Sequence, residues 1–279
     1  MISHILVGTD FSTPSKTMLR NLDVFRDFGV EKLTLLYVRR DRAPIEDSTG
    51  HERYYQALLE EEAKKLESEG WDVDIRNELG RAGSRIVEVA DEVGAEMITV
   101  ANYGRSAVED VVLGSVATDV LERSTLPVFL FCAGAVDEVE AGHEASLWQR
   151  VVLPTDFSKA AEAARQWATR IANWQSLPVA LIHAVDNKSS DDEFEERRHR
   201  IATVRDELDD AGVSKVDVEV VRGEAKKVLD EMAQHYPAGL FVMGSHGRSW
   251  FRDLVFGGVA RSVARRGTHH ALFVPAPRS

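Results

Sequence analysis

The chain has 279 residues, with 34 lysines and arginines against 46 aspartates and glutamates, and its formal net charge is −12. This balance opposes non-specific attraction to nucleic acid or to an anionic membrane surface. The single cysteine, Cys132, excludes an internal disulfide and a cluster of thiol metal ligands. The longest apolar stretch, around residues 126–136, is shorter than the ~20 residues of a membrane-spanning helix. The first residues read as a strand, not as a signal peptide. We therefore expect a cytoplasmic protein without nucleic-acid or membrane partners.

Short apolar runs alternate with amphipathic segments along the first half. The runs predict strands at 5–7, 33–38, 73–75, 97–100 and 128–131. Between them, apolar residues recur at helical spacing within 18–28, 55–66 and 86–90. The stretch 134–147 carries four acids and few large apolar residues, which is typical of a linker.

The second half repeats this alternation. Strands are predicted near 151–154, 179–185, 216–221, 240–243 and 271–274, and helices near 159–174, 192–211, 224–235 and 258–266. Five strands separated by four helices are typical of a parallel sheet covered on both faces. Right-handed crossovers would bring the loops after the first and fourth strands together at the carboxyl edge of that sheet, where such sheets bind ligands.

Two glycine-containing loops, 101–117 and 244–260, are versions of one sequence. The second lies 143 residues after the first, because Gly104 corresponds to Gly247 and Gly114 to Gly257. The segment Thr-Asp-Phe-Ser also occurs twice, after the first predicted strand of each half, with Asp10 and Asp156 in equivalent positions. A unit this long can bury its own core, unlike a solenoid repeat. We expect two globular domains, 1–134 and 149–279, joined by an acidic linker at 135–148.

These motifs resemble those of the universal stress protein family, present here as two copies of the family's domain in tandem. In ATP-binding members the glycine loop reads Gly-x2-Gly-x9-Gly-Ser/Thr. The corresponding residues are Ala101, Gly104, Gly114 and Ser115 in the first half, and Gly244, Gly247, Gly257 and Gly258 in the second. Each half matches three of the four positions, and the mismatches fall at opposite ends of the loop.

The resemblance implies a fold and an assembly. Each half should be a five-stranded parallel doubly wound domain, Rossmann-like and of the adenine nucleotide alpha hydrolase-like type, with the two related by pseudo-twofold symmetry. The family associates through its last strand, so 128–131 and 271–274 should pair antiparallel, which would make the polypeptide its own internal dimer. Pro275 would end the second of these strands because proline has no ladder donor. A further homodimer and a protein partner of unknown identity stay open.

The resemblance also implies adenine nucleotide, namely ATP with or without Mg²⁺, as the ligand of at least one half. The aspartate after the first strand would contact the adenosine end, and the glycine loop would hold ribose and phosphates. Glycines lack a Cβ and leave positive φ open, and the helix that follows offers free N–H groups to anions. The implied contacts are Thr9, Asp10, Val38, Val100, Gly104, Gly114, Ser115 and Val116 in the first half, and Pro154, Thr155, Asp156, Ala184, Met243, Gly244, Gly247, Gly257, Gly258 and Val259 in the second.

The departures from the family pattern favour the second half. Ala101 adds a methyl group where the family has none, whereas Gly258 keeps its N–H and loses only a hydroxyl, at a cost of roughly 1.5 to 3 kcal/mol. Restoring the hydroxyl with Gly258→Ser should tighten ATP binding, and Ala101→Gly should create or improve a site in the first half.

Three alternatives stay open. Asp10 and Asp156 could serve only to cap the helices that follow, since Ser12 and Ser158 also have the pattern of N-caps. Both loops could be inactive, which would leave a nucleotide-free interaction module. The protein could also hydrolyse ATP slowly as a switch, although no catalytic or metal-binding residue set repeats in both halves. His246 lies within the glycine loop, where we interpret it as part of the loop's architecture.

Overall fold

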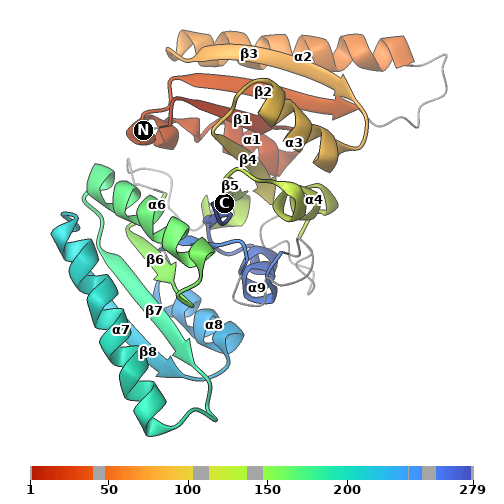
Figure 1. Cartoon of the computed structure of the whole chain (residues 1–279). Coiled ribbons are helices and arrows are strands. Elements are labelled where there is room, and N and C mark those ends of the chain that lie inside the picture. The colour runs from red at the N-terminus through yellow and green to blue at the C-terminus, as the bar shows by residue number, and fades with distance from the viewer. Residues whose placement is uncertain are drawn as a thin grey trace. The chain divides into compact units, whose positions relative to one another are not determined.

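The computed structural model describes residues 2–39, 48–102, 113–136, 147–237, 239–246 and 256–277. The chain divides into two compact units (Figure 1). Unit 1 comprises Met1–Asn102 and Gly114–Ala133, and Gly134–Ser279 belongs to unit 2. Each unit has a parallel sheet accompanied by helices, so the predicted α/β class and the duplication are both confirmed.

Unit 1 contains five strands in the spatial order β3-β2-β1-β4-β5, with every neighbouring pair parallel. The strands are β1 (His4–Gly8), β2 (Lys32–Arg39), β3 (Asp72–Leu79), β4 (Met97–Asn102) and β5 (Val128–Cys132). The helical segments are α1 (Thr13–Leu19), the 3-10 helix η1 (Leu22–Phe28), α2 (Ser48–Ser68), α3 (Ala82–Glu92) and α4 (Ser115–Arg123). The short helix α5 (Ala133–Val136) begins at the last residue of unit 1, and its other residues belong to unit 2.

Unit 2 has the equivalent order, β8-β7-β6-β9-β10, again with parallel neighbours. Its strands are β6 (Arg150–Pro154), β7 (Val179–Val185), β8 (Val216–Arg222), β9 (Gly239–Gly244) and β10 (Ala271–Val274), and its helices are α6 (Lys159–Gln175), α7 (Asp191–Asp210), α8 (Ala225–His235) and α9 (Gly258–Arg266). In both units the first strand lies between the second and the fourth. The chain order therefore reverses beside the first strand, where open parallel sheets bind ligands.

The core of each unit comprises its central strands together with β5 or β10, which stand at the end of the strand order opposite β3 or β8. All residues of β1, β5 and β10 are buried. Of the outer strands, β3 has half-buried and exposed residues, and every residue of β8 is half-buried. Helices cover both faces of a doubly wound sheet, which explains why its central strands are continuously apolar. β10 ends at Val274, directly before Pro275. The predicted pairing of 128–131 with 271–274 concerns the arrangement of the two units and stays a prediction.

The apolar residues within 18–28 do not form one helix. α1 ends at Leu19, and η1 begins at Leu22 and ends before Gly29, whose φ is +85°. Between them, the Asn21 side chain donates a hydrogen bond to the Thr17 carbonyl at 2.8 Å and its backbone N–H donates to the Met18 carbonyl at 3.0 Å. An asparagine that bonds to the preceding turn competes with the regular ladder, so the helix is interrupted there. The equivalent segment of unit 2 is the single helix α6.

Trp148, the last residue of the expected linker, has a fully buried side chain. Its indole Nε1 donates a hydrogen bond to Gln175 Oε1 at 2.5 Å, and its ring packs edge-on against His270 at 5.7 Å between centroids. Residues 137–146 of the linker lie outside the described residues. The side chain of Trp148 therefore belongs to the core of unit 2.

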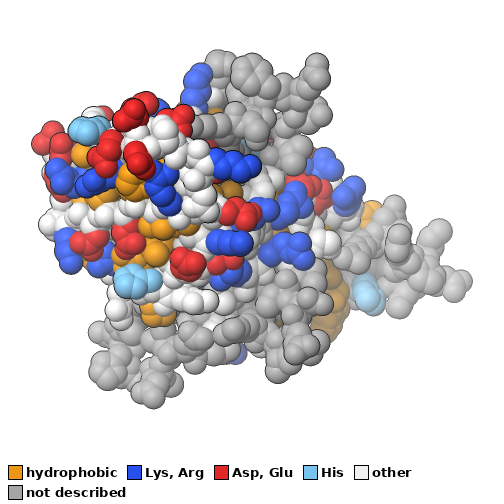
Figure 2. Space-filling model, turned by 90° about the horizontal axis from the view of Figure 1, so that it is seen from below, with side chains coloured by type: hydrophobic (Ala, Val, Ile, Leu, Met, Phe, Trp, Pro, Cys, Tyr) orange, Lys and Arg blue, Asp and Glu red, His pale blue; other side chains and the backbone are white. Residues whose placement is uncertain are grey.

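Acidic and basic side chains are interspersed on the face of the molecule drawn in Figure 2, and the hydrophobic ones are scattered between them. The described side chains of this face form no continuous basic surface. Among the helices that the structure describes, none has a stretch both long enough and apolar enough to cross a membrane.

Candidate functional site

The segment Thr-Asp-Phe-Ser forms the same turn in both units, directly after the first strand. In unit 1 the Thr9 hydroxyl accepts a hydrogen bond from the Phe11 N–H at 3.1 Å, and Asp10 Oδ1 accepts one from the Ser12 N–H at 2.9 Å. In unit 2 the corresponding distances for Thr155 and Asp156 are 3.1 and 3.0 Å. Each aspartate thus bonds to the residue that precedes the next helix, which supports the turn. These carboxylates bond to the N-cap residue and not to the first N–H groups of the helix. The cap of α6 is the Ser158 hydroxyl, which accepts a hydrogen bond from the Ala161 N–H at 3.2 Å, whereas Ser12 makes no side-chain cap bond to α1.

The phenylalanine of each turn has left-handed backbone, with φ of 57° at Phe11 and 62° at Phe157. A bulky residue rarely adopts this conformation, which costs of order 1–3 kcal/mol and occurs mostly at functional sites. The side-chain hydrogen bonds on either side hold it in place. The strain directs the chain away from the strand and leaves the aspartate at the carboxyl edge of the sheet.

The two aspartates differ in their further partners. The Ser15 hydroxyl donates a hydrogen bond to Asp10 Oδ1 at 2.9 Å. Burial alone would raise the pKa of Asp10, but the hydrogen bonds from Ser12 and Ser15 outweigh it, and the pKa lies below its ordinary value. The equivalent of Ser15 in unit 2 is Ala161, which has no hydroxyl to offer Asp156.

The helices that follow the glycine loops begin alike. Gly114 precedes α4 with φ −56° and ψ 143°, and Gly257 precedes α9 with φ −58° and ψ 142°. Neither helix has a side-chain cap or an acidic residue in its first turn. The N–H groups at such a helix start are available to an anion, and the helix dipole favours negative charge there. A β-carbon at Gly114 would meet no atom within 4 Å, so that glycine leaves open space.

Gly244 has a different reason to be glycine. From the sequence we expected the glycines of this loop to allow a positive φ, but the φ of Gly244 is not positive. A β-carbon there would lie 2.8 Å from Ala160 Cβ and 2.9 Å from the Ala160 carbonyl carbon, both in the first turn of α6. The glycine is therefore required by the close approach of α6 to β9. We accordingly expect Ala101, its equivalent in unit 1, to act through the position of α1.

Unit 2 has a cavity of about 380 Å³ at the carboxyl edge of its sheet. All the described residues that the sequence predicted as contacts in this half line it, namely Pro154, Thr155, Asp156, Ala184, Met243, Gly244, Gly257, Gly258 and Val259. The remaining predicted contact, Gly247, lies outside the described residues. The volume falls within the range of small-molecule sites. Their role as ligand contacts stays a prediction.

Six further residues line the cavity that the sequence did not indicate: Ala161, Ile182, Ala225, Leu229, His246 and Ala260. Ile182 lies two positions before Ala184 and so shares its face of the strand. Ala225 and Leu229 are four apart on one face of α8. These periodicities could have identified the three residues. Ala225 and Leu229, however, reach the cavity only because α8 packs against α9.

His246 adds a polar group to the cavity wall. Its Nδ1 is hydrogen-bonded to the Ser245 hydroxyl at 2.7 Å, and its Nε2 is buried without a hydrogen-bond partner in the described part of the chain. Burial lowers the pKa of this histidine, so the ring is neutral near pH 7. A buried ring nitrogen without a partner is costly unless a ligand or water satisfies it.

The predicted contacts of unit 1 occupy equivalent positions. Thr9 and Asp10 follow β1, Val38 lies on β2 and Val100 on β4, and these strands pair in parallel with β1 at the centre. Gly114 precedes α4, and Ser115 and Val116 open it. Gly104 lies outside the described residues.

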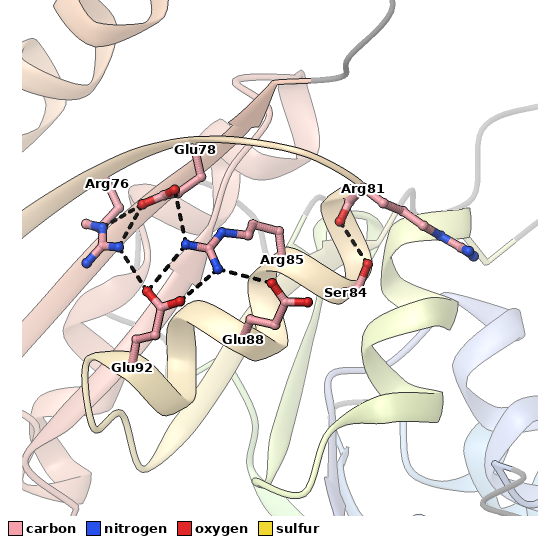
Figure 3. Close-up of polar contacts among 7 residues, drawn as sticks. All are labelled: Arg76, Glu78, Arg81, Ser84, Arg85, Glu88 and Glu92. Carbon is pink, nitrogen blue, oxygen red and sulfur yellow. Dashed lines mark hydrogen bonds and ion pairs between the residues drawn. The ribbon is translucent and has the colours of Figure 1, made fainter.

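The charged side chains of unit 1 are paired with one another near α4. Asp119 of α4 is largely buried, with Oδ2 3.2 Å from Arg81 Nε and Oδ1 2.6 Å from Arg123 Nε. Figure 3 shows Arg81 extending away from a second network on α3 and β3. That network joins Arg76 and Arg85 to the carboxylates of Glu78, Glu88 and Glu92.

Comparison with known proteins gives a consistent result. A sequence model of the universal stress protein family matches residues 1–131 and 147–275. A universal stress protein of Mycolicibacterium smegmatis is 26% identical over 97% of this chain and 96% of its own. The crystal structure of a universal stress protein from Archaeoglobus fulgidus superposes with a TM-score of 0.79 at 22% identity, covering 98% of each chain. The match to a universal stress protein solved in complex with cAMP covers 47% of this chain and 100% of that one, with a TM-score of 0.40 at 25% identity.

Proposed function

The chain belongs to the universal stress protein family, and from this membership we propose that it is a stress-response regulatory protein that binds adenine nucleotide, ATP above all, in the cavity of unit 2. Unit 1 is the poorer site in this proposal. The proposal assigns no catalytic residue and no protein ligand for Mg²⁺.

One observation carries the proposal. The residues of the predicted nucleotide-binding motif come from four separate segments of the second half, and they line a single cavity. They come from the end of β6, from β7, from the end of β9 and from the start of α9. Packing against α6 explains Gly244, but it does not explain why Gly257 and Gly258 share a cavity with Asp156.

The chemistry of the lining fits an adenine nucleotide. Ile182, Leu229 and Met243 provide apolar surface suited to a base. The start of α9 offers N–H groups to phosphate, and Asp156 can accept hydrogen bonds from ribose hydroxyls. The buried Nε2 of His246 is a further polar group that a ligand could satisfy.

Calorimetric titration with ATP tests the proposal, and titration with cAMP compares a second adenine nucleotide. We expect ATP to bind with a stoichiometry of one per chain. Asp156→Asn should lower ATP affinity by roughly ten- to a hundredfold, the value of a hydrogen bond to a charged group. The amide retains an oxygen for the Ser158 N–H, so the turn should persist. Asp10→Asn in unit 1 is the matched control and should leave the affinity unchanged.

Two outcomes would replace the proposal. If neither nucleotide binds, and mass spectrometry of the denatured protein finds no carried-over nucleotide, a nucleotide-free interaction module becomes the better description. If ATP binds and phosphate is released on a scale of minutes to hours, the protein is a slow ATPase switch.

A further inference from the structure

Lys226 lies beside the start of α9. It is the second residue of α8, a helix that packs against α9. A β-carbon at Gly258 would lie 3.7 Å from Lys226 Cε and 3.8 Å from Lys226 Nζ. The ammonium group thus lies next to the position where ATP-binding members of the family carry a serine or threonine side chain.

Within the described residues, no acid neutralises the charge of Lys226. The side chain forms no ion pair with any described residue. The start of α9, next to it, is also positive because of the helix dipole and has no acidic residue in its first turn. Two positive groups side by side repel each other in the free protein, and an anion between them would remove that repulsion.

The equivalent region of unit 1 is built differently. Gly83 precedes Lys226 by 143 residues, as Ser115 precedes Gly258. A β-carbon at Gly83 would overlap the side chain of Asp119, which fills this space and pairs with Arg81 and Arg123. Unit 1 therefore has a hydroxyl and a neutralised carboxylate where unit 2 has a glycine and an ammonium group that pairs with no acid among the described residues.

Lys226 does not line the cavity of unit 2, but it lies beside Gly258, which does. We propose that Lys226 binds the phosphates of a nucleotide in this cavity, that it replaces the missing side chain at position 258, and that it makes the site selective for the polyphosphate form of the nucleotide. This inference rests on the proposed function. The adenosine part of the ligand contacts other groups of the cavity, so Lys226 affects the phosphates alone.

The test compares ATP and adenosine as ligands of the full chain by calorimetry. Lys226→Gln should weaken ATP binding by up to about fivefold, as expected for an exposed charge pair. It should leave adenosine affinity equal to that of the wild type, since the pair is lost only where phosphate is present. Lys226→Arg should retain most of the ATP affinity. Lys227→Gln is the matched control, because it removes the same charge one residue further along α8. Added salt should weaken ATP binding more in the wild type than in Lys226→Gln.

The outcomes separate this inference from the proposed function. If the wild type binds ATP and Lys226→Gln behaves like Lys227→Gln, Lys226 has no role and the nucleotide site stands. If adenosine binds as tightly as ATP to the wild type, the selectivity for phosphate is refuted. If the wild type binds neither ligand, both the site and the role of Lys226 are refuted. Loss of ATP affinity confined to Lys226→Gln supports the inference.

Discussion

The starts of α4 and α9 have nearly the same backbone and different side chains around them. Gly114 and Gly257 agree within 2° in φ, at −56° and −58°. The neighbouring helix contributes Gly83 in unit 1 and Lys226 in unit 2. The duplicated fold has thus kept the geometry that presents N–H groups to an anion, while the charge beside that geometry has diverged. A conserved loop shape is therefore insufficient to decide whether both units bind the same ligand.

The largest expected effect concerns the close approach of α6 to β9. Gly244→Ala forces a β-carbon against Ala160 in unit 2, and we expect the free energy of unfolding of that unit to fall by roughly 1–3 kcal/mol. The reciprocal change, Ala101→Gly, should cost unit 1 about 1 kcal/mol or less. Urea unfolding followed by hydrogen exchange can report on the two units separately. Equal effects of the two variants would show that the units pack alike at this position.

The next effect concerns affinity. Gly258→Ser gives unit 2 the hydroxyl that unit 1 has in Ser115. Nothing closer than 3.7 Å obstructs its β-carbon, and the added hydrogen bond to phosphate should tighten ATP binding by roughly ten- to a hundredfold. Calorimetric titration measures the change. An unaltered affinity would indicate that the phosphates lie away from the start of α9.

A smaller effect is expected at Asp10. Ser15→Ala reproduces the alanine found in unit 2 and removes the hydroxyl that bonds to Asp10. The pKa of Asp10 should rise toward its ordinary value, because fewer hydrogen bonds then stabilise the charged carboxylate against the effect of burial. A carboxyl with a lowered pKa contributes stability above its unfolded-state pKa and loses it as the pH falls through the folded pKa. In the variant this loss should begin at a higher pH. NMR titration of the Asp10 carboxyl carbon would show an unchanged pKa if Ser15 does not matter.

The smallest effect concerns the ion-pair network on α3 (Figure 3). Its central residue, Arg85, is replaced by Val228 at the equivalent position of unit 2. Arg85→Met removes its pairs with Glu78, Glu88 and Glu92. Exposed pairs of this kind contribute about 1 kcal/mol or less, so unit 1 should lose little stability, and less still in high salt. Thermal unfolding in low and high salt measures this. A loss that salt does not reduce would mean that Arg85 acts through packing.

The sequence predicted most of the fold because hydrophobic periodicity and duplication pointed the same way. The expected helix at 258–266 agrees with α9, and all five strands of unit 2 occur where the apolar runs predict them. The break at Asn21 was not predicted, since apolar spacing is similar for an α-helix and for a helix that continues as a 3-10 turn.

The candidate site was only partly predictable. Asp156 and the glycines were identified from a repeated motif, but the reason for Gly244 lies in its distance from Ala160, which no periodicity encodes. Lys226 falls outside the motif, and the equivalent residue of the first copy is Gly83, not a lysine. Its place beside Gly258 depends on how two helices pack, so a comparison of the repeats could not have identified it.

The most direct test of the account is a crystal structure of the full chain with a non-hydrolysable ATP analogue. We predict one nucleotide in the cavity of unit 2, with its phosphates at the N–H groups of Gly258 and Val259, the first residues of α9, and within reach of Lys226 Nζ. A nucleotide bound only in unit 1, or bound to unit 2 outside this cavity, would contradict the account.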